Sequence, residues 1–406
     1  MDLNSFQVAT SETARDINRR IVLNLLRTRQ PLSRADLARH SGLQRSTVSV
    51  IVEQLISEQW VNEGAIGHLP RGRRPRFLQI NDERAGVVGI NVRPAQTTIA
   101  IANLNAQFLA QEQMPTASDP RQFVDELTQR AKAFVKAHAD VSIEGVGVSL
   151  PGRVDCQTQR LTFAPNLGWR DLDLKTPLER ATGLPVELEN AANACALAEI
   201  WFGGNLENST DLVSVTVSEG IGTGIVIDGQ LMRGPTGEAG EFGHVSINED
   251  GPLCKCGNRG CWETYASNSA AIDFYLQATS KARHGKKDYA PNGNQTAAPS
   301  PSFEDLLRLS EQGNVQAREA IERMAKYLGV GIAMLSTSIA PRVIIIVGEV
   351  TRVWNSIEPI INKVVAERLP NRGVPKIIPA NDAAQPRLRG TIALVLQKHF
   401  GAPAIA

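Results

Sequence analysis

The sequence brings one imidazole and three thiols together within a short stretch: His244, Cys254, Cys256 and Cys261. One histidine and three cysteines form a donor set that Zn²⁺ takes in closed structural sites. Four protein ligands leave no position for a water, so we expect a structural Zn²⁺ rather than a catalytic one. Incidental cysteines in a loop are the alternative. For the two remaining cysteines, Cys156 and Cys195, we expect ordinary buried thiols.

Two carboxylates flank this cluster, Glu241 on one side and Glu263 on the other. A metal-bound loop would order both of them, and carboxylates are good acceptors for the vicinal hydroxyls of a sugar. Most glutamates are solvated surface residues, so the pair by itself is only a weak indication of a sugar site.

Charge is unevenly distributed along the 406 residues, although the net charge is only +1. Residues 1–80 contain twelve Arg, no Lys and seven acidic side chains, a net +5, so the remainder of the chain carries −4. A basic head is typical of a nucleic-acid-binding module joined to another domain, although a solvated basic face would give the same charge. No apolar run reaches the length of a membrane span, and we expect a cytoplasmic protein.

The head has the periodicity of a winged helix-turn-helix. Apolar spacing predicts a helix over residues 13–29, and a capping box at Ser33 and Asp36 starts the second helix. A glycine turn leads into a third amphipathic helix, as in the helix-turn-helix unit. Two short strands, 60–63 and 77–80, would enclose a basic wing.

The residues expected to contact double-stranded DNA lie at the start of the third helix and in the wing. The helix residues would face base edges and phosphates in the major groove, and the wing arginines would contact phosphates or a minor groove. The set is Gln44, Arg45, Ser46, Thr47, Ser49, Arg71, Arg73 and Arg74. A three-helix interaction domain with a solvated basic loop is the alternative.

The rest of the chain alternates strands and helices, which is typical of an α/β fold. The apolar patterns predict strands at 86–92, 97–104, 108–110, 143–150, 186–189, 212–217, 224–227 and 343–347. They predict helices at 120–139, 191–202, 266–281, 303–312 and 315–338. The polar stretch 285–302 is interpreted as a solvent loop.

The segment from Gly240 to Glu263 resembles the signature of the ROK family (repressors, open reading frames, kinases). It reads Gly-Glu-Phe-Gly-His and then Cys-x-Cys-Gly-Asn-Arg-Gly-Cys-Trp-Glu. The resemblance extends over essentially the whole chain. It implies an N-terminal winged helix-turn-helix followed by a two-lobed, actin-like (ribonuclease-H-like) sugar-kinase body.

The resemblance also implies the division of the chain and its site residues. The head would occupy 1–81 and the first lobe 82–192, to which a C-terminal helix at 388–406 returns. The second lobe would occupy 193–387, with the zinc site and a dimer interface. The family zinc ligands fall on the His/Cys set above. The family sugar contacts fall on Gly152, Arg153, Asn166, Asn190, Glu241, His244 and Glu263. For the first four of these, turn chemistry explains the residue type equally well.

The groups that a kinase of this family uses on its nucleotide side are replaced. Asn190 is followed by Ala191, where the kinases carry an Asp as general base. The first phosphate loop reads Asn91–Pro94, which loses an acid and places side chains where glycines would admit phosphates. The second phosphate loop keeps its glycines, but Glu219 places a negative charge beside the phosphates that it would hold. Glu349 puts an acid in the nucleotide-side turn, where glycine is usual in the kinases.

We therefore expect a sugar-responsive transcriptional regulator and not an enzyme. It would repress carbohydrate uptake or catabolism genes as a homodimer or tetramer, and its inactive kinase-like body would sense a small-molecule sugar. An ATP-dependent sugar kinase with a DNA-binding head is the alternative. A repressor controlled by a protein partner or a phosphosugar is the third possibility.

Overall fold

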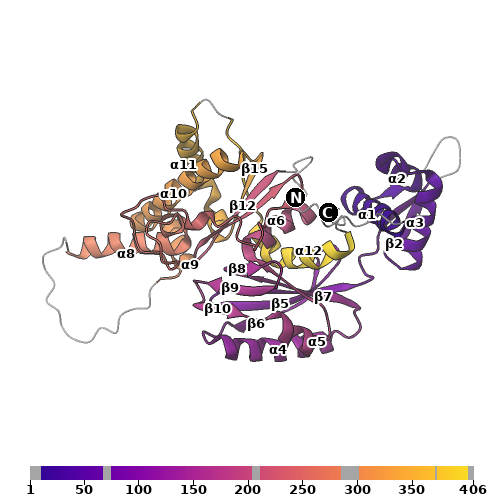
Figure 1. The fold of residues 1–406 in the computed structure, drawn as a ribbon. Helices are drawn as coiled ribbons and strands as arrows, with labels where there is room; N and C mark the ends of the chain where they lie inside the picture. The colour runs from indigo at the N-terminus through magenta and orange to yellow at the C-terminus, as the bar shows by residue number, and fades with distance from the viewer. Residues whose placement is uncertain (1–10, 67–74, 204–210, 285–300, 371–372, 401–406) are drawn as a thin grey trace.

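The computed structural model describes residues 11–66, 75–203, 211–284, 301–370 and 373–400, which form a small head and a two-lobed body (Figure 1). Each lobe of the body is built on a five-stranded mixed sheet. None of the helices in these described ranges has the length and apolarity that a membrane span requires.

The head is a winged helix-turn-helix, as predicted. Its helices are α1 (Ser11–Arg29), α2 (Arg34–Ser41) and α3 (Arg45–Ser57). Its sheet has the order β1-β3-β2, formed by β1 (Leu32–Ser33), β3 (Arg76–Ile80) and β2 (Val61–Ile66). The predicted capping box is present, because the Ser33 hydroxyl accepts from the Asp36 amide at 3.2 Å and the Ser33 amide donates to the Asp36 carboxylate at 3.0 Å. Of the wing, Arg71, Arg73 and Arg74 lie outside the described residues.

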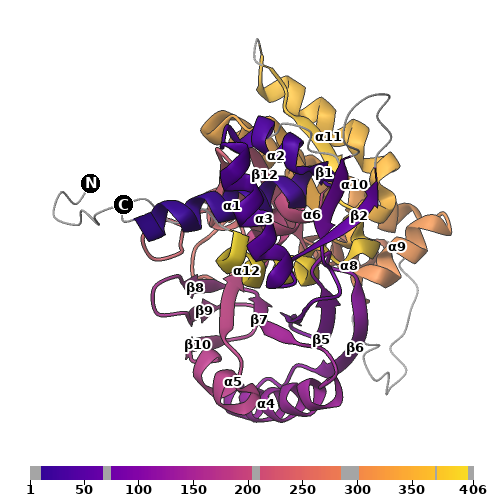
Figure 2. The ribbon, with the colours of Figure 1, turned by 90° about the vertical axis from the view of Figure 1, so that its right-hand side faces the viewer.

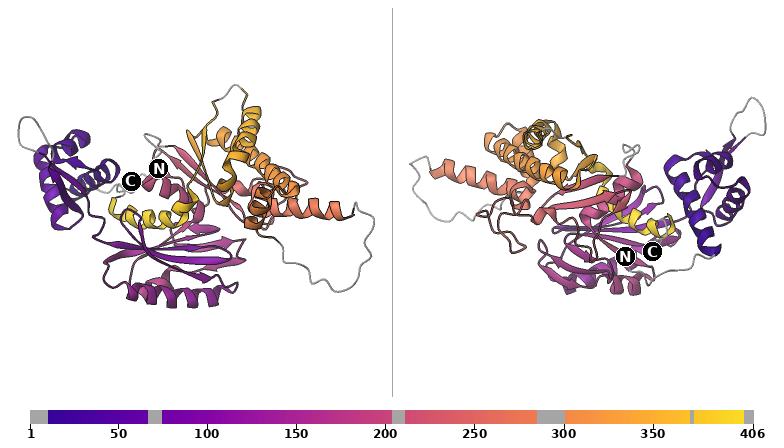
Figure 3. Two further views of the ribbon diagram at one scale, coloured as in Figure 1. Left: turned by 180° about the vertical axis from the view of Figure 1, so that it is seen from behind. Right: turned by 45° about the horizontal axis from the view of Figure 1, so that its top comes forward.

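The first lobe has a sheet of order β11-β7-β4-β5-β6. The strands are β4 (Gly86–Val92), β5 (Gln96–Asn103), β6 (Phe108–Pro115), β7 (Ile143–Leu150) and β11 (Val186–Asn190). One face carries α4 (Pro120–Ala137) and α5 (Lys175–Thr182), and the other carries α12 (Pro386–Phe400) (Figures 1 and 3). A small antiparallel sheet beside it contains β8 (Arg153–Asp155), β9 (Arg160–Ala164) and β10 (Trp169–Leu172).

The second lobe has a sheet of order β14-β13-β12-β15-β16. The strands are β12 (Leu212–Val217), β13 (Ile221–Ile227), β14 (Gln230–Leu231), β15 (Val343–Val347) and β16 (Lys376–Pro379). Its helices are α7 (Glu263–Ala266), α8 (Asn268–His284), α9 (Phe303–Glu311), α10 (Val315–Ile339) and α11 (Trp354–Arg368). The five residues of β15 are all buried, as expected for a central parallel strand.

Two helices join the parts of the molecule. The helix α6 (Ala191–Phe202) packs against both α12 and the second-lobe sheet, while α12 packs on the first-lobe strands β4 and β7. A single buried apolar cluster continues from the head, through Leu26 and Trp60, to Phe400 at the end of α12. Figure 2, in which the head faces the viewer, shows the head in front of the body, with α12 behind it. The head is therefore packed on the body rather than tethered by a bare linker.

Gly390 in α12 allows the close approach of α12 to α6. A Cβ at this position would lie 1.9 Å from the carbonyl oxygen of Ala194 in α6. We expect Gly390→Ala to lower the free energy of unfolding by about 1–3 kcal/mol, because an added methyl must force the two helices apart. Thermal denaturation measures the effect. Gly373→Ala, where an added Cβ meets nothing within 4 Å, is the control, and an equal loss in both variants would contradict the packing argument.

Candidate functional site

All seven residues predicted to contact sugar line one pocket between the lobes: Gly152, Arg153, Asn166, Asn190, Glu241, His244 and Glu263. They come from segments more than 100 residues apart in the sequence, and they line a cleft that is partly open to solvent. Thr216, Ser218 and Arg387 line the same pocket. Polar donors and acceptors that converge on a concave site are typical of a small-molecule pocket.

Asn190 forms part of the pocket wall at the start of α6. It is the last residue of β11 and caps α6, since its side-chain oxygen accepts from the Ala192 amide at 2.8 Å. Its side-chain amide donates to the Gly152 carbonyl at 2.5 Å. Both ends of the amide are thus used to join β11, α6 and the turn that carries Arg153. The next residue, Ala191, contributes no ionisable group to the pocket.

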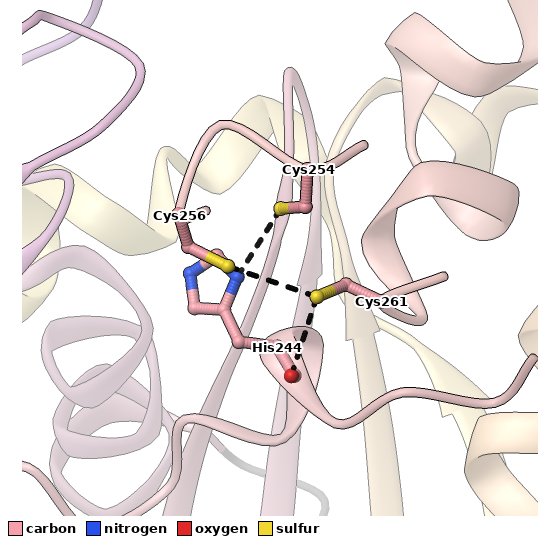
Figure 4. Close-up of side chains that lie close together, drawn as sticks. All are labelled: His244, Cys254, Cys256 and Cys261. Atoms are coloured by element: carbon pink, nitrogen blue, oxygen red, sulfur yellow. Dashed lines mark hydrogen bonds between the residues drawn. The ribbon is translucent and has the colours of Figure 1, made fainter. Parts of the chain in front are cut away.

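The four candidate metal ligands converge in the structure. One donor atom from each of His244, Cys254, Cys256 and Cys261 lies within 4.8 Å of all the others (Figure 4). The Cys256 and Cys261 sulfurs are 3.7 Å apart, and the Cys254 sulfur is 3.7 Å from His244 Nδ1. Zn–S bonds of about 2.3 Å in a tetrahedron place two sulfurs ~3.8 Å apart, so the donors fit a metal ion of this kind.

The protonation of the thiols depends on what they bind. Burial raises the pKa of the Cys261 thiol to about 11 and raises that of Cys254 further. A bound divalent cation favours the thiolate instead.

Of the other two cysteines, Cys195 is buried as predicted, and burial raises its pKa to about 12. The prediction for Cys156 was wrong, because its thiol lies only half-buried near the carbonyl of Pro235.

The metal cluster and the pocket share His244. Its Nδ1 lies among the thiols and 3.4 Å from Glu263 Oε1, while its Nε2 lies 3.6 Å from Glu241 Oε2. Burial raises the pKa of Glu241, and the nearby charges of His244 and Arg153 oppose that shift. The loop that would hold the metal therefore also sets the positions of both pocket carboxylates.

The same loop reaches across to the first lobe. Lys255, between two of the cysteines, donates from Nζ to Asn166 Oδ1 at 3.2 Å. On the other side of the pocket, Arg153 lies 3.3 Å from Glu238 and 3.7 Å from Glu241. Lys255 was not predicted, because nothing in the sequence indicates which residue a surface lysine will meet.

An ion-pair triad joins the two lobes. The Arg93 guanidinium lies 2.8 Å from Glu349 Oε1 and 3.4 Å from Glu219 Oε1. Arg93 follows β4 in the first lobe, whereas both acids belong to the second lobe. The Arg93 charge helps to hold the pKa of Glu349 below its ordinary value, against the opposing effect of burial. Arg93, from the altered first phosphate loop, and the two acids noted in the sequence, Glu219 and Glu349, thus form one contact between the lobes.

The described DNA-contact candidates lie at the beginning of α3. Gln44, which precedes the helix, and the first two helical residues, Arg45 and Ser46, are exposed, and Thr47 is half-buried. Ser49 is also half-buried and its hydroxyl donates to the Arg45 carbonyl at 2.9 Å, so it has a bond within the helix. An exposed helix start of this composition can present side chains to a DNA groove.

A winged helix-turn-helix joined to a two-lobed sugar-kinase-like body defines a class of regulator with a ligand pocket. The chain belongs to the ROK family, whose profile matches residues 87–398. The profile of the IclR helix-turn-helix domain matches residues 21–63 in the head.

Full-length relatives include regulators with the same organisation. The xylose repressor of Bacillus spizizenii (strain ATCC 23059 / NRRL B-14472 / W23) is 30% identical over 97% of this chain and 98% of that protein. The crystal structure of a ROK family transcriptional regulator, a homologue of the E. coli Mlc protein, superposes with a TM-score of 0.79 at 27% identity, covering 96% and 98% of the two chains. The body alone, 77% of this chain, superposes on the whole ROK family glucokinase from Streptomyces griseus in complex with glucose and AMPPNP, with a TM-score of 0.68 and 27% identity.

Proposed function

We propose that this protein is a sugar-responsive transcriptional repressor, in which the head binds operator DNA and the pocket between the lobes binds the effector. The observation that carries the proposal is the convergence of the seven predicted sugar contacts on one pocket, beneath a head of the DNA-binding type. The xylose repressor similarity over nearly the full length supports the same function. The protein would act in the cytoplasm on genes for carbohydrate uptake or catabolism.

Two helices provide a physical connection between the pocket and the head. Both α6 and α12 begin at the pocket, with Ala191 and Arg387 in its lining. At their other ends, Trp201 and Phe400 contact the head. The Arg27 guanidinium of α1 donates to the Trp201 carbonyl at 3.2 Å, and the Trp60 and Phe400 ring centroids are 5.7 Å apart. A ligand that favours one arrangement of the lobes would therefore shift the head.

The recognition-helix assignment predicts a large effect of one arginine. We expect Arg45→Ala to weaken operator binding by about 1–3 kcal/mol and to relax sequence preference, because an exposed arginine at the helix start can bind a guanine edge. Fluorescence anisotropy with a labelled upstream DNA fragment measures the affinity. Arg318→Ala, on the exposed surface of α10, is the matched control. Unchanged affinity and preference for Arg45→Ala would contradict the assignment.

A homodimer or tetramer would place two heads on half-sites about one helical turn apart. The pseudo-palindromic operator expected for such an assembly follows from its two-fold symmetry. Light scattering of the purified chain tests the oligomeric state, and a monomer in complex with DNA would contradict this part of the proposal.

Zinc is the metal that best fits the His/Cys₃ donor set. His244, Cys254, Cys256 and Cys261 would hold it, and it would supply a fixed cross-link that orders the loop between β14 and α7. In the described part of that loop, the regular structure is limited to a three-residue 3₁₀ helix (Phe242–His244) and two isolated bridges. Ordering by the metal would position Glu241 and Glu263 for sugar hydroxyls.

Kinase activity is the second candidate, since the body superposes on a glucokinase. We propose that the body is catalytically inactive. Ala191 cannot accept a proton, and Arg93, Glu219 and Glu349, from the segments that would hold nucleotide phosphates in a kinase of the family, pair with one another. A coupled ADP assay with common hexoses and pentoses should give no turnover above background. Robust turnover would contradict the sensor assignment.

A further inference from the structure

The outward side of α3 carries an exposed apolar side chain, Val50. It is 56% exposed, which makes it the most exposed large apolar side chain that the structure describes in the head. Four other apolar residues of the helix are buried in the head core: Val48, Ile51, Val52 and Leu55. A single exposed valine is ordinary on a protein surface, so its meaning depends on what this side of the helix faces.

The side of α3 that carries Val50 also carries the predicted DNA contacts. Ser46 precedes Val50 by four residues and Glu53 follows it by three, so these side chains share one side of the helix. Arg45 and Ser49 lie next to them, one helical turn apart. Figure 1 shows α3 on the side of the head away from the body, and Ser46, Val50 and Glu53 are all exposed. This surface is therefore open to a DNA groove.

The neighbours of Val50 indicate which part of the DNA this surface would meet. The Ser49 hydroxyl donates to the Arg45 carbonyl at 2.9 Å, so its proton is already used within the helix. Glu53 carries a negative charge that backbone phosphates would repel. The surface around Val50 is thus better suited to base edges than to the phosphate backbone, which is the position of a recognition helix in the major groove.

We propose that Val50 contacts the 5-methyl group of a thymine, so that α3 selects a T·A pair at one position of each half-site. The inference rests on the proposed DNA-binding function and concerns its sequence specificity. The thymine methyl is the apolar group that base edges present in the major groove, where the other groups are hydrogen-bond donors and acceptors. A valine against one of those would displace water without replacing its hydrogen bond, so the contact also disfavours the other bases.

Replacement of thymine by uracil tests the contact, because the two bases differ only in this methyl group. The upstream DNA fragment is prepared with dTTP or with dUTP, and fluorescence anisotropy with the full-length chain gives the affinity for each. We expect the wild-type protein to bind the uracil fragment about fourfold more weakly for each half-site. This factor corresponds to the ~0.8 kcal/mol that burial of one such group contributes.

One substitution assigns the preference for thymine to Val50. Val50→Ala should lose the preference, because the shorter side chain does not reach the methyl group. The variant should fold, since the side chain is exposed and alanine is the better helix former, and circular dichroism checks this. Ile21→Ala, which shortens an exposed apolar side chain on α1, is the matched control and should keep the preference. Single replacements of thymine by deoxyuridine then locate the contacted base pair.

Two results would overturn the assignment: the wild-type protein binds both fragments equally, or Val50→Ala keeps the wild-type preference. Loss of the preference in Ile21→Ala as well would assign the effect to the stability of the head and would also overturn it. In these cases, specific binding of the thymine fragment leaves the DNA-binding function standing. If the chain binds neither fragment more tightly than an unrelated sequence of the same length, the DNA-binding function fails and the assignment fails with it.

Discussion

Replacing Cys261 by serine should abolish the metal centre and with it the sugar response. We expect the bound metal to fall from one ion per chain to a small fraction. Changing a residue that only contacts the metal ligands lowers metal affinity roughly 10–100-fold, and loss of a ligand itself should cost more. Sugar affinity should fall by at least about tenfold, since Glu241, His244 and Glu263 would no longer be held together. Metal analysis by atomic emission and calorimetry with the sugar measure the two effects.

The physical reason is that the loop between β14 and α7 contains little regular secondary structure, so its conformation depends on individual contacts. One of these contacts is made by Trp262, which is fully buried and whose Nε1 donates to the Tyr327 carbonyl at 2.8 Å. Structural zinc contributes folding free energy directly, so chelation of the wild-type protein should also lower its melting temperature. Cys156→Ser, a half-exposed thiol outside the cluster, is the matched control. Full sugar affinity in a metal-free Cys261→Ser protein would contradict the account.

Replacing Phe400 by alanine should uncouple the head from the pocket. The Phe400 ring is 2% exposed and lies 5.7 Å from the Trp60 ring and 5.6 Å from the Trp201 ring, measured between centroids. Its removal should cost about 3–5 kcal/mol of packing, which exceeds a typical allosteric coupling of ~1–3 kcal/mol. We therefore expect sugar to bind with unchanged affinity but to lose its effect on DNA affinity. Calorimetry and DNA anisotropy with and without sugar separate the two.

The control for Phe400→Ala is a second Phe→Ala substitution that removes a buried ring far from the head. Phe134, 6% exposed on α4, packs on the face of the first-lobe sheet opposite α12. Phe134→Ala should lower stability to a similar degree and keep the sugar response of DNA binding. If both variants keep the response, the connection through α12 is wrong. If both lose it, general destabilisation rather than the junction is responsible.

Local signals in the sequence predicted the elements that have strong periodicity or caps. The capping box at Ser33 and the all-β-branched strand at 343–347 were placed correctly. The elements that were missed are short or irregular in pattern: β1, β8–β10, α5, β14, β16 and α11, which contains Pro359. The strand predicted at 224–227 begins at Ile221, and α8 begins at Asn268 after the separate turn α7, because glycines and a buried Glu263 obscure the pattern.

From residue types and spacing alone, the site was predictable only where its residues lie in one continuous motif, whereas Gly152, Arg153, Asn166 and Asn190 were placed by the family resemblance. The His/Cys₃ set and Glu263 lie within 20 residues of one another, so the sequence alone indicates that they act together. The partners of Arg93 lie 126 and 256 residues away, and the sequence showed only that their charges are unusual. Arg387 was missed, since its place in the pocket depends on how α12 returns to the first lobe, which is a property of the tertiary fold.

The proposal that a sugar ligand controls DNA binding is tested by measuring the operator affinity of the purified full-length chain. Fluorescence anisotropy at fixed salt, with a panel of sugars and sugar phosphates, gives this affinity. We expect at least one of these ligands to change DNA affinity by about 5–150-fold, and we expect Cys261→Ser and Phe400→Ala both to abolish the change. If the protein binds one of these ligands and none of them alters its DNA affinity, the proposal that a sugar controls DNA binding is contradicted.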